Sequence, residues 1–168
     1  MCATMLRASD LKTRIQSTGY DVADHGNVEV SQDLLRHIRR LRRGGSQQSD
    51  EAFFSENIQP HVSDVLEGLA QETYSAVKAN GLPLVLGGDN CTTVGGLVGA
   101  QRARAEMAKL PLGLLVFNAH AGCNTWKTTK SQQLRGMTLS ALLGASVAGF
   151  DDLTRSVTHD GETGEASE

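Results

Sequence analysis

The sequence has few of the features that mark secreted, membrane-spanning or strongly charged proteins. It contains three cysteines, Cys2, Cys91 and Cys123, and no CxxC pair. An odd number of cysteines without paired spacing does not fit a closed disulfide framework, so we expect a reducing compartment. No stretch approaches the roughly 18 uninterrupted apolar residues of a membrane-spanning helix. These absences predict a cytoplasmic protein with no membrane partner.

Neither sign of charge dominates the chain. There are 16 Lys and Arg against 19 Asp and Glu, with a net charge of -3, so global attraction to nucleic acid or to an anionic membrane is not expected. One segment differs, since residues 36–43 hold His37 and five arginines: Arg36, Arg39, Arg40, Arg42 and Arg43. This basic helix would suit RNA, an anionic lipid or an acidic protein. A solvated helix face is the simpler interpretation, and nucleic acid is not the partner we expect.

The chain is long enough for one compact domain. Its 168 residues, of which 39% are hydrophobic, can bury a single core. Residues 151–168 are acidic, rich in Ser, Thr and Gly, and nearly devoid of large apolar groups. We therefore predict one domain over residues 1–150 and a disordered tail over residues 151–168.

Helical spacing of apolar residues predicts two strong helices in the first half of the chain. The first follows Ser31, which can cap it, and ends at residues 44–45, two glycines. A polar loop over residues 46–59 separates it from the second, which begins near Pro60 and ends at residues 80–81. Shorter helices are predicted between Leu6 and Ser17 and over residues 137–143.

Two continuous apolar runs, at residues 82–86 and 112–117, have the pattern of strands that are covered on both faces. Residues 92–109 between them can form a helix. This strand–helix–strand order predicts an α/β fold, with a parallel sheet in a three-layer αβα arrangement. Any binding crevice should then lie at the carboxyl ends of the strands.

Polar strings follow both predicted strands. The first reads Gly87-Gly88-Asp89-Asn90, and the second reads Asn118-Ala119-His120-Ala121-Gly122-Cys123-Asn124-Thr125. In order and spacing they resemble the metal-binding motifs of the ureohydrolase superfamily of arginases and agmatinases. The TTxS element at residues 128–131 is typical of the arginase branch. The resemblance implies an arginase-like fold and, in the family, manganese-dependent hydrolysis of guanidino compounds such as arginine.

The chain departs from the family at the residues that would hold manganese. Asn90, Asn118 and Gly122 stand where the family has histidine, aspartate and aspartate, and His120 is the only ligand retained. Asparagine offers a neutral carbonyl and glycine has no side chain, whereas paired divalent ions need carboxylates. We therefore expect no bound manganese and no metal-activated hydroxide.

The substrate loop is only partly retained. The resemblance gives a substrate-binding role to four positions: Asn124, Ser131, Gln133 and Arg135. Gln133 replaces an asparagine of the family, and Arg135 replaces a histidine that assists proton transfer. A permanent cation at Arg135 would repel a guanidinium substrate.

The resemblance also implies an arginase-like domain that is incomplete at both ends. The first strand of the family would precede Leu6, and its remaining metal ligands would lie beyond residue 168. We predict an inactive pseudoenzyme or fragment that acts by binding, either as a homo-oligomer or to an intact ureohydrolase subunit. One alternative is a residual amidinohydrolase with substitute ligands such as Cys91, Cys123 or Asp89. Another is the non-functional product of a damaged or artificial gene.

Three further features each allow two interpretations. Cys91 and Cys123 could join His120 in a soft zinc site, or pair as a disulfide, but two ordinary buried thiols are the simpler expectation. Trp126 would either plug the active-site mouth or pack on its loop. The glycines of residues 95–99 suit tight packing between a strand and a helix better than they suit phosphate binding.

Overall fold

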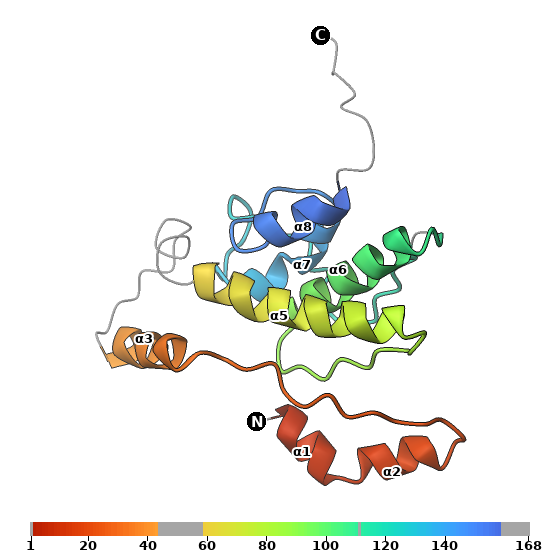
Figure 1. Ribbon diagram of the computed structural model, residues 1–168. Coiled ribbons are helices and arrows are strands. Elements are labelled where there is room, and N and C mark those ends of the chain that lie inside the picture. Colours follow the sequence, from red (N-terminus) through yellow and green to blue (C-terminus); the bar gives the residue numbers. More distant parts are fainter. Residues whose placement is uncertain (1, 44–58, 111, 159–168) are drawn as a thin grey trace.

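The computed structural model describes residues 2–43, 59–110 and 112–158, and its regular elements are helices (Figure 1). They are α1 (Cys2–Ala8), α2 (Leu11–Gln16), α3 (Gln32–Arg43), α5 (Gln59–Lys78), α6 (Cys91–Glu106), the 3-10 turn η1 (Leu134–Gly136), α7 (Thr138–Leu142) and α8 (Asp151–Thr158). Within these described ranges no helix is long and apolar enough to cross a membrane.

Local capping explains where two of the predicted helices begin or end. The Ser31 hydroxyl accepts a hydrogen bond of 3.1 Å from the Leu34 N–H, which confirms Ser31 as the cap of α3. After α5, Asn80 takes a left-handed conformation (φ 59°), and the Gly81 N–H donates to the Ala76 carbonyl at 2.8 Å. Asparagine tolerates this conformation, so the end predicted at residues 80–81 is confirmed. The predicted end of α3 at residues 44–45 and the loop at 46–58 lie outside the described residues.

The amino-terminal helix predicted between Leu6 and Ser17 is two helices. Asp10 has a left-handed φ of 59° and separates α1 from α2. Arg7 of α1 forms an ion pair of 3.2 Å with Asp24 and also contacts the Gly26 carbonyl. His25 next to it lies 3.1 Å from Glu72 of α5. These polar contacts join α1 and the following loop to the rest of the described chain.

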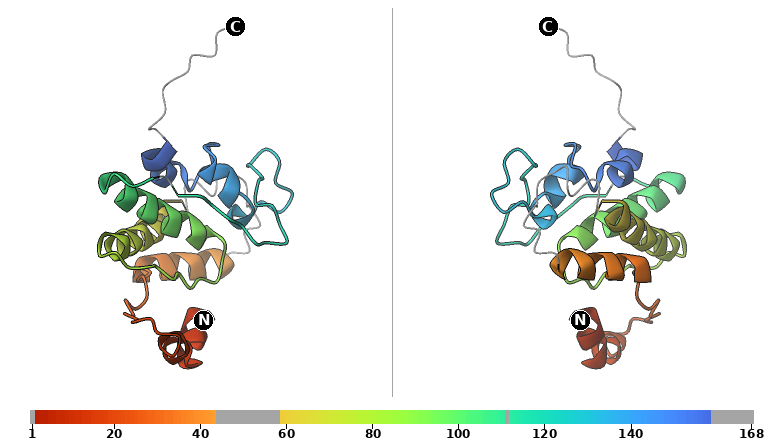
Figure 2. Two further views of the ribbon diagram at one scale, coloured as in Figure 1. Left: turned by 90° about the vertical axis from the view of Figure 1, so that its right-hand side faces the viewer. Right: turned by 90° about the vertical axis from the view of Figure 1, so that its left-hand side faces the viewer.

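Helices α5 and α6 lie side by side (Figures 1 and 2) and are held at close range by glycine. A Cβ atom added at Gly95 would lie 2.7 Å from the Leu66 carbonyl oxygen, and one added at Gly99 would collide with the Ala70 carbonyl. Only glycine allows the α6 backbone to approach α5 this closely. The glycines of residues 95–99 therefore serve helix-to-helix packing, although Gly96 between them faces Val85 of the chain before α6.

Charged and polar side chains border this contact. Arg102 of α6 reaches Glu67 of α5 at 2.5 Å, and Lys78 of α5 reaches Glu106 of α6 at 3.2 Å. The Tyr74 hydroxyl donates to the same Glu106 carboxylate at 2.5 Å, and this hydrogen bond raises the pKa of Tyr74 and lowers the pKa of Glu106. Because these pairs lie at the border of the contact, near solvent, they contribute little to stability.

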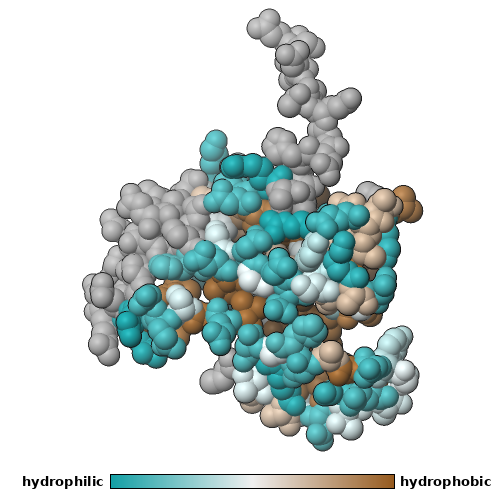
Figure 3. Space-filling view, viewed as in Figure 1, coloured by the Kyte–Doolittle hydropathy of each residue, from teal (hydrophilic) through white to brown (hydrophobic). Residues whose placement is uncertain are grey.

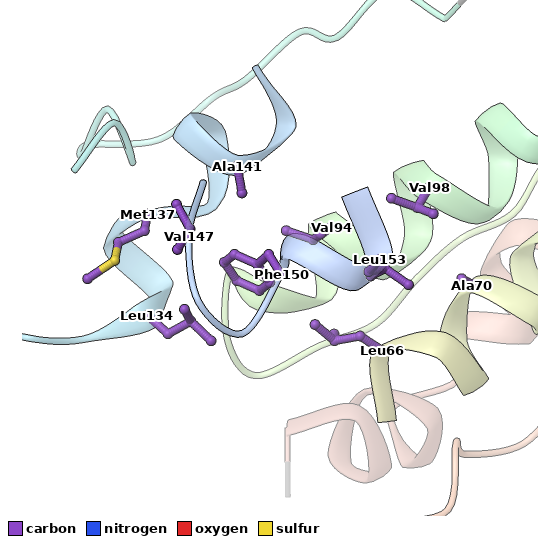
Figure 4. Close-up of a cluster of buried hydrophobic side chains, with 10 residues drawn as sticks. All are labelled: Leu66, Ala70, Val94, Val98, Leu134, Met137, Ala141, Val147, Phe150 and Leu153. Carbon is purple, nitrogen blue, oxygen red and sulfur yellow. The ribbon is translucent and has the colours of Figure 1, made fainter. Parts of the chain in front are cut away.

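One hydrophobic core joins α5, α6, η1, α7 and α8 (Figure 4). Phe150, just before α8, is its largest fully buried side chain. The cluster consists of Leu66, Ala70, Val94, Val98, Leu134, Met137, Ala141, Val147, Phe150 and Leu153. The carboxyl-terminal helices are thus packed on the α5–α6 pair by side chains from both halves of the described chain.

Residues 151–158 differ from their prediction. They form α8, in which Leu153 is 3% and Thr154 is 5% exposed. Two well-placed side chains next to the buried Phe150 are enough to order a short helix, although its composition resembles that of a disordered segment. The rest of the predicted tail, residues 159–168, lies outside the described residues.

The two predicted strands differ from the structure more than the predicted tail does. No strand occurs in the ranges that the structure describes, so the parallel sheet is not confirmed. Both predicted strands, residues 82–86 and 112–117, are extended segments without regular secondary structure. No backbone–backbone hydrogen bond joins either segment to another described residue. A strand exists only where a neighbour supplies N–H and C=O partners. With no such neighbour described, Leu82 and Phe117 remain 89% and 90% exposed.

We expect Gly99→Ala to destabilise the protein, by about 1–3 kcal/mol, because the added methyl group would force α6 away from α5. Alanine by itself favours a helix over glycine by about 1 kcal/mol, so a net loss would come from the collision. Gly88→Ala is the control, since nothing lies within 4 Å of its added Cβ. Urea unfolding followed by circular dichroism measures both variants, and equal stabilities would contradict the close contact.

We expect Leu153→Ala to cost about 2–5 kcal/mol, because it leaves a cavity in the core. Asp152→Ala on the same helix should change little, since this side chain is 71% exposed and its 3.9 Å pair with Arg155 is weak. The same unfolding measurement applies. A Leu153 variant as stable as the Asp152 variant would mean that α8 does not belong to the core.

Candidate functional site

A pocket of about 220 Å³ lies where the segment 112–117 meets the start of α6 and the helix α7. Asn90, just before α6, and Thr93 in its first turn line one side, and Thr138, Leu139 and Leu142 line it from α7. Residues 114–118 and 120–122 complete the wall. The pocket therefore brings together the four positions that the resemblance relates to metal binding: Asn90, Asn118, His120 and Gly122.

Short-range hydrogen bonds shape the two polar strings around this pocket. The Asp89 carboxylate accepts the Cys91 N–H at 2.9 Å, at the first turn of α6. The Asn118 side-chain oxygen accepts the His120 N–H at 3.0 Å. Both oxygens are the acceptors of turns that their own sequence neighbours form. Asp89 and Asn118 thus serve local backbone structure in this chain.

Gly122 has acquired a structural role of its own. Its φ is +68°, and its carbonyl oxygen accepts the N–H groups of Leu139 and Ser140 at 3.0 and 3.3 Å. An added Cβ would lie 3.2 Å from the Thr138 hydroxyl oxygen. A side chain here would meet both an unfavourable φ and a crowded neighbour. The position implied for an aspartate ligand is occupied by a residue that anchors the start of α7.

The donors around the pocket do not fit a pair of manganese ions. Of the described residues that line it, His120 is the one imidazole and none is a carboxylate. Nowhere in the described chain do three or more His, Cys, Asp or Glu side chains gather in a way that could hold a metal ion. Two adjacent divalent cations require several anionic oxygen ligands. Neutral amides and one imidazole cannot balance that charge.

The predicted substrate-binding side chains lie apart from this pocket. All four are exposed, and none lines it: Asn124, Ser131, Gln133 and Arg135. The Asn124 N–H donates to the Gly136 carbonyl at 3.1 Å, and the Thr128 hydroxyl donates to the Asn124 side-chain oxygen at 3.3 Å. Asn124 is therefore engaged within its own loop.

Comparison with known protein families identifies the family to which this arrangement of residues belongs. The model of the Arginase family matches residues 2–158, which is most of the chain. The chain belongs to the arginase family. The match includes both polar strings and the loop at residues 126–137, which leads from the second string to α7. All residues around the pocket therefore lie within the matched region.

Similar curated proteins are arginases from bacteria and a mammal. The chain is 26% identical to an arginase of Bacillus subtilis over 147 residues, which are 86% of this chain and 42% of that protein. It is 30% identical to mouse arginase-1 over 152 residues, 88% of this chain and 40% of that protein. The chain thus spans about two fifths of the length of these relatives. No solved structure matches it significantly.

Trp126 packs on its loop in this arginase-family chain. Its indole N–H donates to the Ala148 carbonyl at 3.3 Å, and its ring packs against the hydrophobic core. It is absent from the lining of the pocket. Of the two interpretations, packing on the loop agrees with these contacts and a plug does not.

Two residues of the pocket were missed by sequence reasoning. The hydroxyl-bearing Thr93 and Thr138 line it, and Thr138 is 7% exposed. Neither belongs to a polar string that marks the metal-binding region of the family. Thr93 lies within the first turn of a predicted helix, three residues after Asn90. This spacing from a motif residue is the feature from which its place in the pocket could have been predicted.

The cysteines are not equivalent. Cys91 is half-buried and Cys123 is exposed, and both are free thiols. They do not form a disulfide with each other, and Cys123 does not fit the expectation of a buried thiol. Burial, followed by the hydrogen bond and charge of Asp89, raises the pKa of Cys91 far above its usual value. A protonated thiol is a poor ligand for a soft metal.

We expect iodoacetamide to modify Cys123 at least about tenfold faster than Cys91 at pH 8, because only a thiolate in contact with solvent reacts. A raised pKa leaves Cys91 protonated at every pH below it, so the difference should persist up to mildly alkaline pH. Peptide mass spectrometry of a Cys2→Ser variant measures both rates. Equal rates, or protection of both thiols by zinc, would favour a shared soft-metal site.

Proposed function

We propose that this arginase-family chain is a pseudoenzyme, a binding protein that does not carry out binuclear manganese hydrolysis of guanidino compounds. The observation that supports this most is the composition of the pocket, in which Asn90, Asn118 and Gly122 accompany His120. The family positions have been brought together without the carboxylates that the chemistry requires.

The proposal follows from what paired metal ions supply to hydrolysis. They lower the pKa of a bound water until hydroxide exists near neutral pH. Among the described residues that line this pocket, none is a carboxylate that could hold the ions, and none besides His120 is a base. An imidazole alone can accept a proton, but it cannot replace the electrostatic stabilisation of the attacking hydroxide. Hydrolysis would therefore lack its nucleophile.

The substrate side of the site agrees with this proposal. The Arg135 side chain is exposed and places a permanent positive charge on the loop that the family uses to recognise its substrate. A guanidinium group is also cationic, so the two would repel each other. Asn124 is occupied by Thr128 and Gly136, which leaves less of its hydrogen-bonding capacity for an amino-acid ligand.

The fold that we propose for the functional protein is the αβα arrangement of the family. Residues 82–86 and 112–117 would become strands of a parallel sheet once neighbouring strands are present. Both segments already run along α6: Val85 lies beside Gly96, and the Leu112 N–H donates to the Gln101 side chain at 3.1 Å. A cytoplasmic location and action through binding, to another copy or to an intact ureohydrolase subunit, complete the proposal.

Manganese content and urea release test the proposal. We expect the dialysed protein to retain far less than one equivalent of manganese and to release no urea from arginine or agmatine. Asn90→His combined with Asn118→Asp should increase manganese affinity about tenfold or more, because it adds an imidazole and a carboxylate beside His120. Adding His120→Ala to that variant should abolish the gain. Inductively coupled plasma mass spectrometry and a colorimetric urea assay give the two results.

One result would support a residual amidinohydrolase instead. Stoichiometric manganese in the unaltered protein, together with urea release that His120→Ala abolishes, would refute the pseudoenzyme proposal. A matched control is His61→Ala, since His61 lies on α5 and does not line the pocket. Activity that both histidine variants lose equally would indicate general damage to the protein.

A further inference from the structure

The pocket at the start of α6 and α7 is uncharged on the side of the described residues that line it. None of them is Asp, Glu, Lys or Arg, and His120 is their only titratable group. Asp89 directs its carboxylate to the Cys91 N–H, and neither Asp89 nor Arg135 lines the pocket. By contrast, hydrophilic residues cover much of α8 on the face that Figure 3 shows. Because an unpaired charge loses free energy when it leaves water, the pocket favours an uncharged ligand.

Two carboxamide side chains in the pocket keep hydrogen-bonding groups free. The Asn90 side chain does not cap α6 and makes no hydrogen bond to a described residue. The Asn118 oxygen accepts the His120 N–H, but the Asn118 NH₂ group has no partner in the described part of the chain. A carboxamide carries a carbonyl acceptor beside an NH₂ donor, so two carboxamides can form two reciprocal hydrogen bonds. A carboxylate offers only acceptors and an amidinium only donors, so neither can match both groups of Asn90.

Thr138 adds a buried hydroxyl to the same pocket. Thr138 is 7% exposed, and among the described residues its hydroxyl has no hydrogen-bond partner. A Cβ atom at Gly122 would lie 3.2 Å from this hydroxyl oxygen, so the glycine leaves space beside it. A buried polar group without a partner destabilises the folded chain, and a ligand that bonds to it recovers free energy. The hydroxyl can both donate and accept, and a carboxamide can do the same.

The rest of the pocket wall is apolar and accessible to solvent. Leu139 and Leu142 are half-buried, Leu114 is 40% exposed and Phe117 is 90% exposed. The volume of about 220 Å³ suits a ligand on the order of ten non-hydrogen atoms, which is smaller than a drug-sized molecule. The apolar part of such a ligand would lie against these side chains while its polar group reaches the amides and the hydroxyl.

We propose that this pocket binds a small, uncharged primary carboxamide that carries an apolar ring. The inference rests on the proposed loss of metal-dependent hydrolysis, because Asn90 and His120 are available to a ligand only while they hold no metal. The guanidino compounds of the family are cations that offer mainly donors, whereas this pocket offers neutral groups that both donate and accept.

A titration of the isotopically labelled full chain with benzamide, followed by NMR at pH 8 with a metal chelator, tests the proposal. We expect saturable shifts of the amides of residues 118–122 and 138–142, with a dissociation constant of about 1 mM. Benzamidine and benzoate have nearly the shape of benzamide, but at this pH they are a cation and an anion. Both should bind at least about tenfold more weakly, because each brings a charge and loses one of the two reciprocal hydrogen bonds.

Two variants with matched controls test the named side chains. Asn90→Asp keeps the shape but adds a negative charge, so the ratio of benzamide to benzamidine affinity should fall at least about tenfold. Asn80→Asp is its control, since Asn80 follows α5 and does not line the pocket. Thr138→Val should weaken benzamide binding about fivefold, because it removes only the hydroxyl. Its control is Thr154→Val, a change at a threonine of α8 that is 5% exposed and lies outside the pocket.

The outcomes separate this inference from the proposed function. Equal affinities for the three compounds, or no saturable shift at millimolar benzamide, would overturn the carboxamide ligand. Equal affinities of the Thr138→Val and Thr154→Val variants for benzamide would overturn it as well. If the protein meanwhile holds no manganese and releases no urea, the pseudoenzyme proposal stands and the ligand alone is refuted. Stoichiometric manganese together with a preference for benzamidine would refute both.

Discussion

The close contact of α5 with α6 is the constraint on which the rest of the described structure depends. Gly95 and Gly99 let the α6 backbone approach the carbonyl groups of Leu66 and Ala70, where any side chain would collide. This pair then presents Val94 and Val98 to α8 and to the residues around η1 and α7. The same contact fixes the position of the start of α6, where Asn90 and Thr93 line the pocket. The positions of the core and of the candidate site therefore both depend on the two glycines, Gly95 and Gly99.

The helices were predictable from sequence because their signals are local. Ser31 and residues 80–81 act on their own backbone neighbours, and the apolar spacing of α5 needs no knowledge of the partner. Strands are different, because a stretch such as 112–117 becomes a strand only through hydrogen bonds to another segment. The order of α8 was also missed, since it depends on Phe150 and Leu153 reaching a distant core.

The candidate site was predictable to the extent that it follows from the order of the two polar strings. Family resemblance related Asn90, Asn118, His120 and Gly122 to one region, and all four line one pocket. The contacts that these and neighbouring side chains make in the folded protein could not be read from residue types. That Asn118 would bond to the His120 N–H, that Asn124 would bind within its own loop, and that Trp126 would join the core are properties of the folded backbone.

The left-handed backbone at Gly122 has a consequence for the history of the chain. While a position only binds metal, its loss can be undone by a single reverse substitution. Once the same position holds the first N–H groups of α7 and tolerates no side chain without strain, regaining a ligand would require compensating changes around Thr138. A single Gly122→Asp substitution would therefore disturb the loop and the start of α7 before it could place a carboxylate in the pocket.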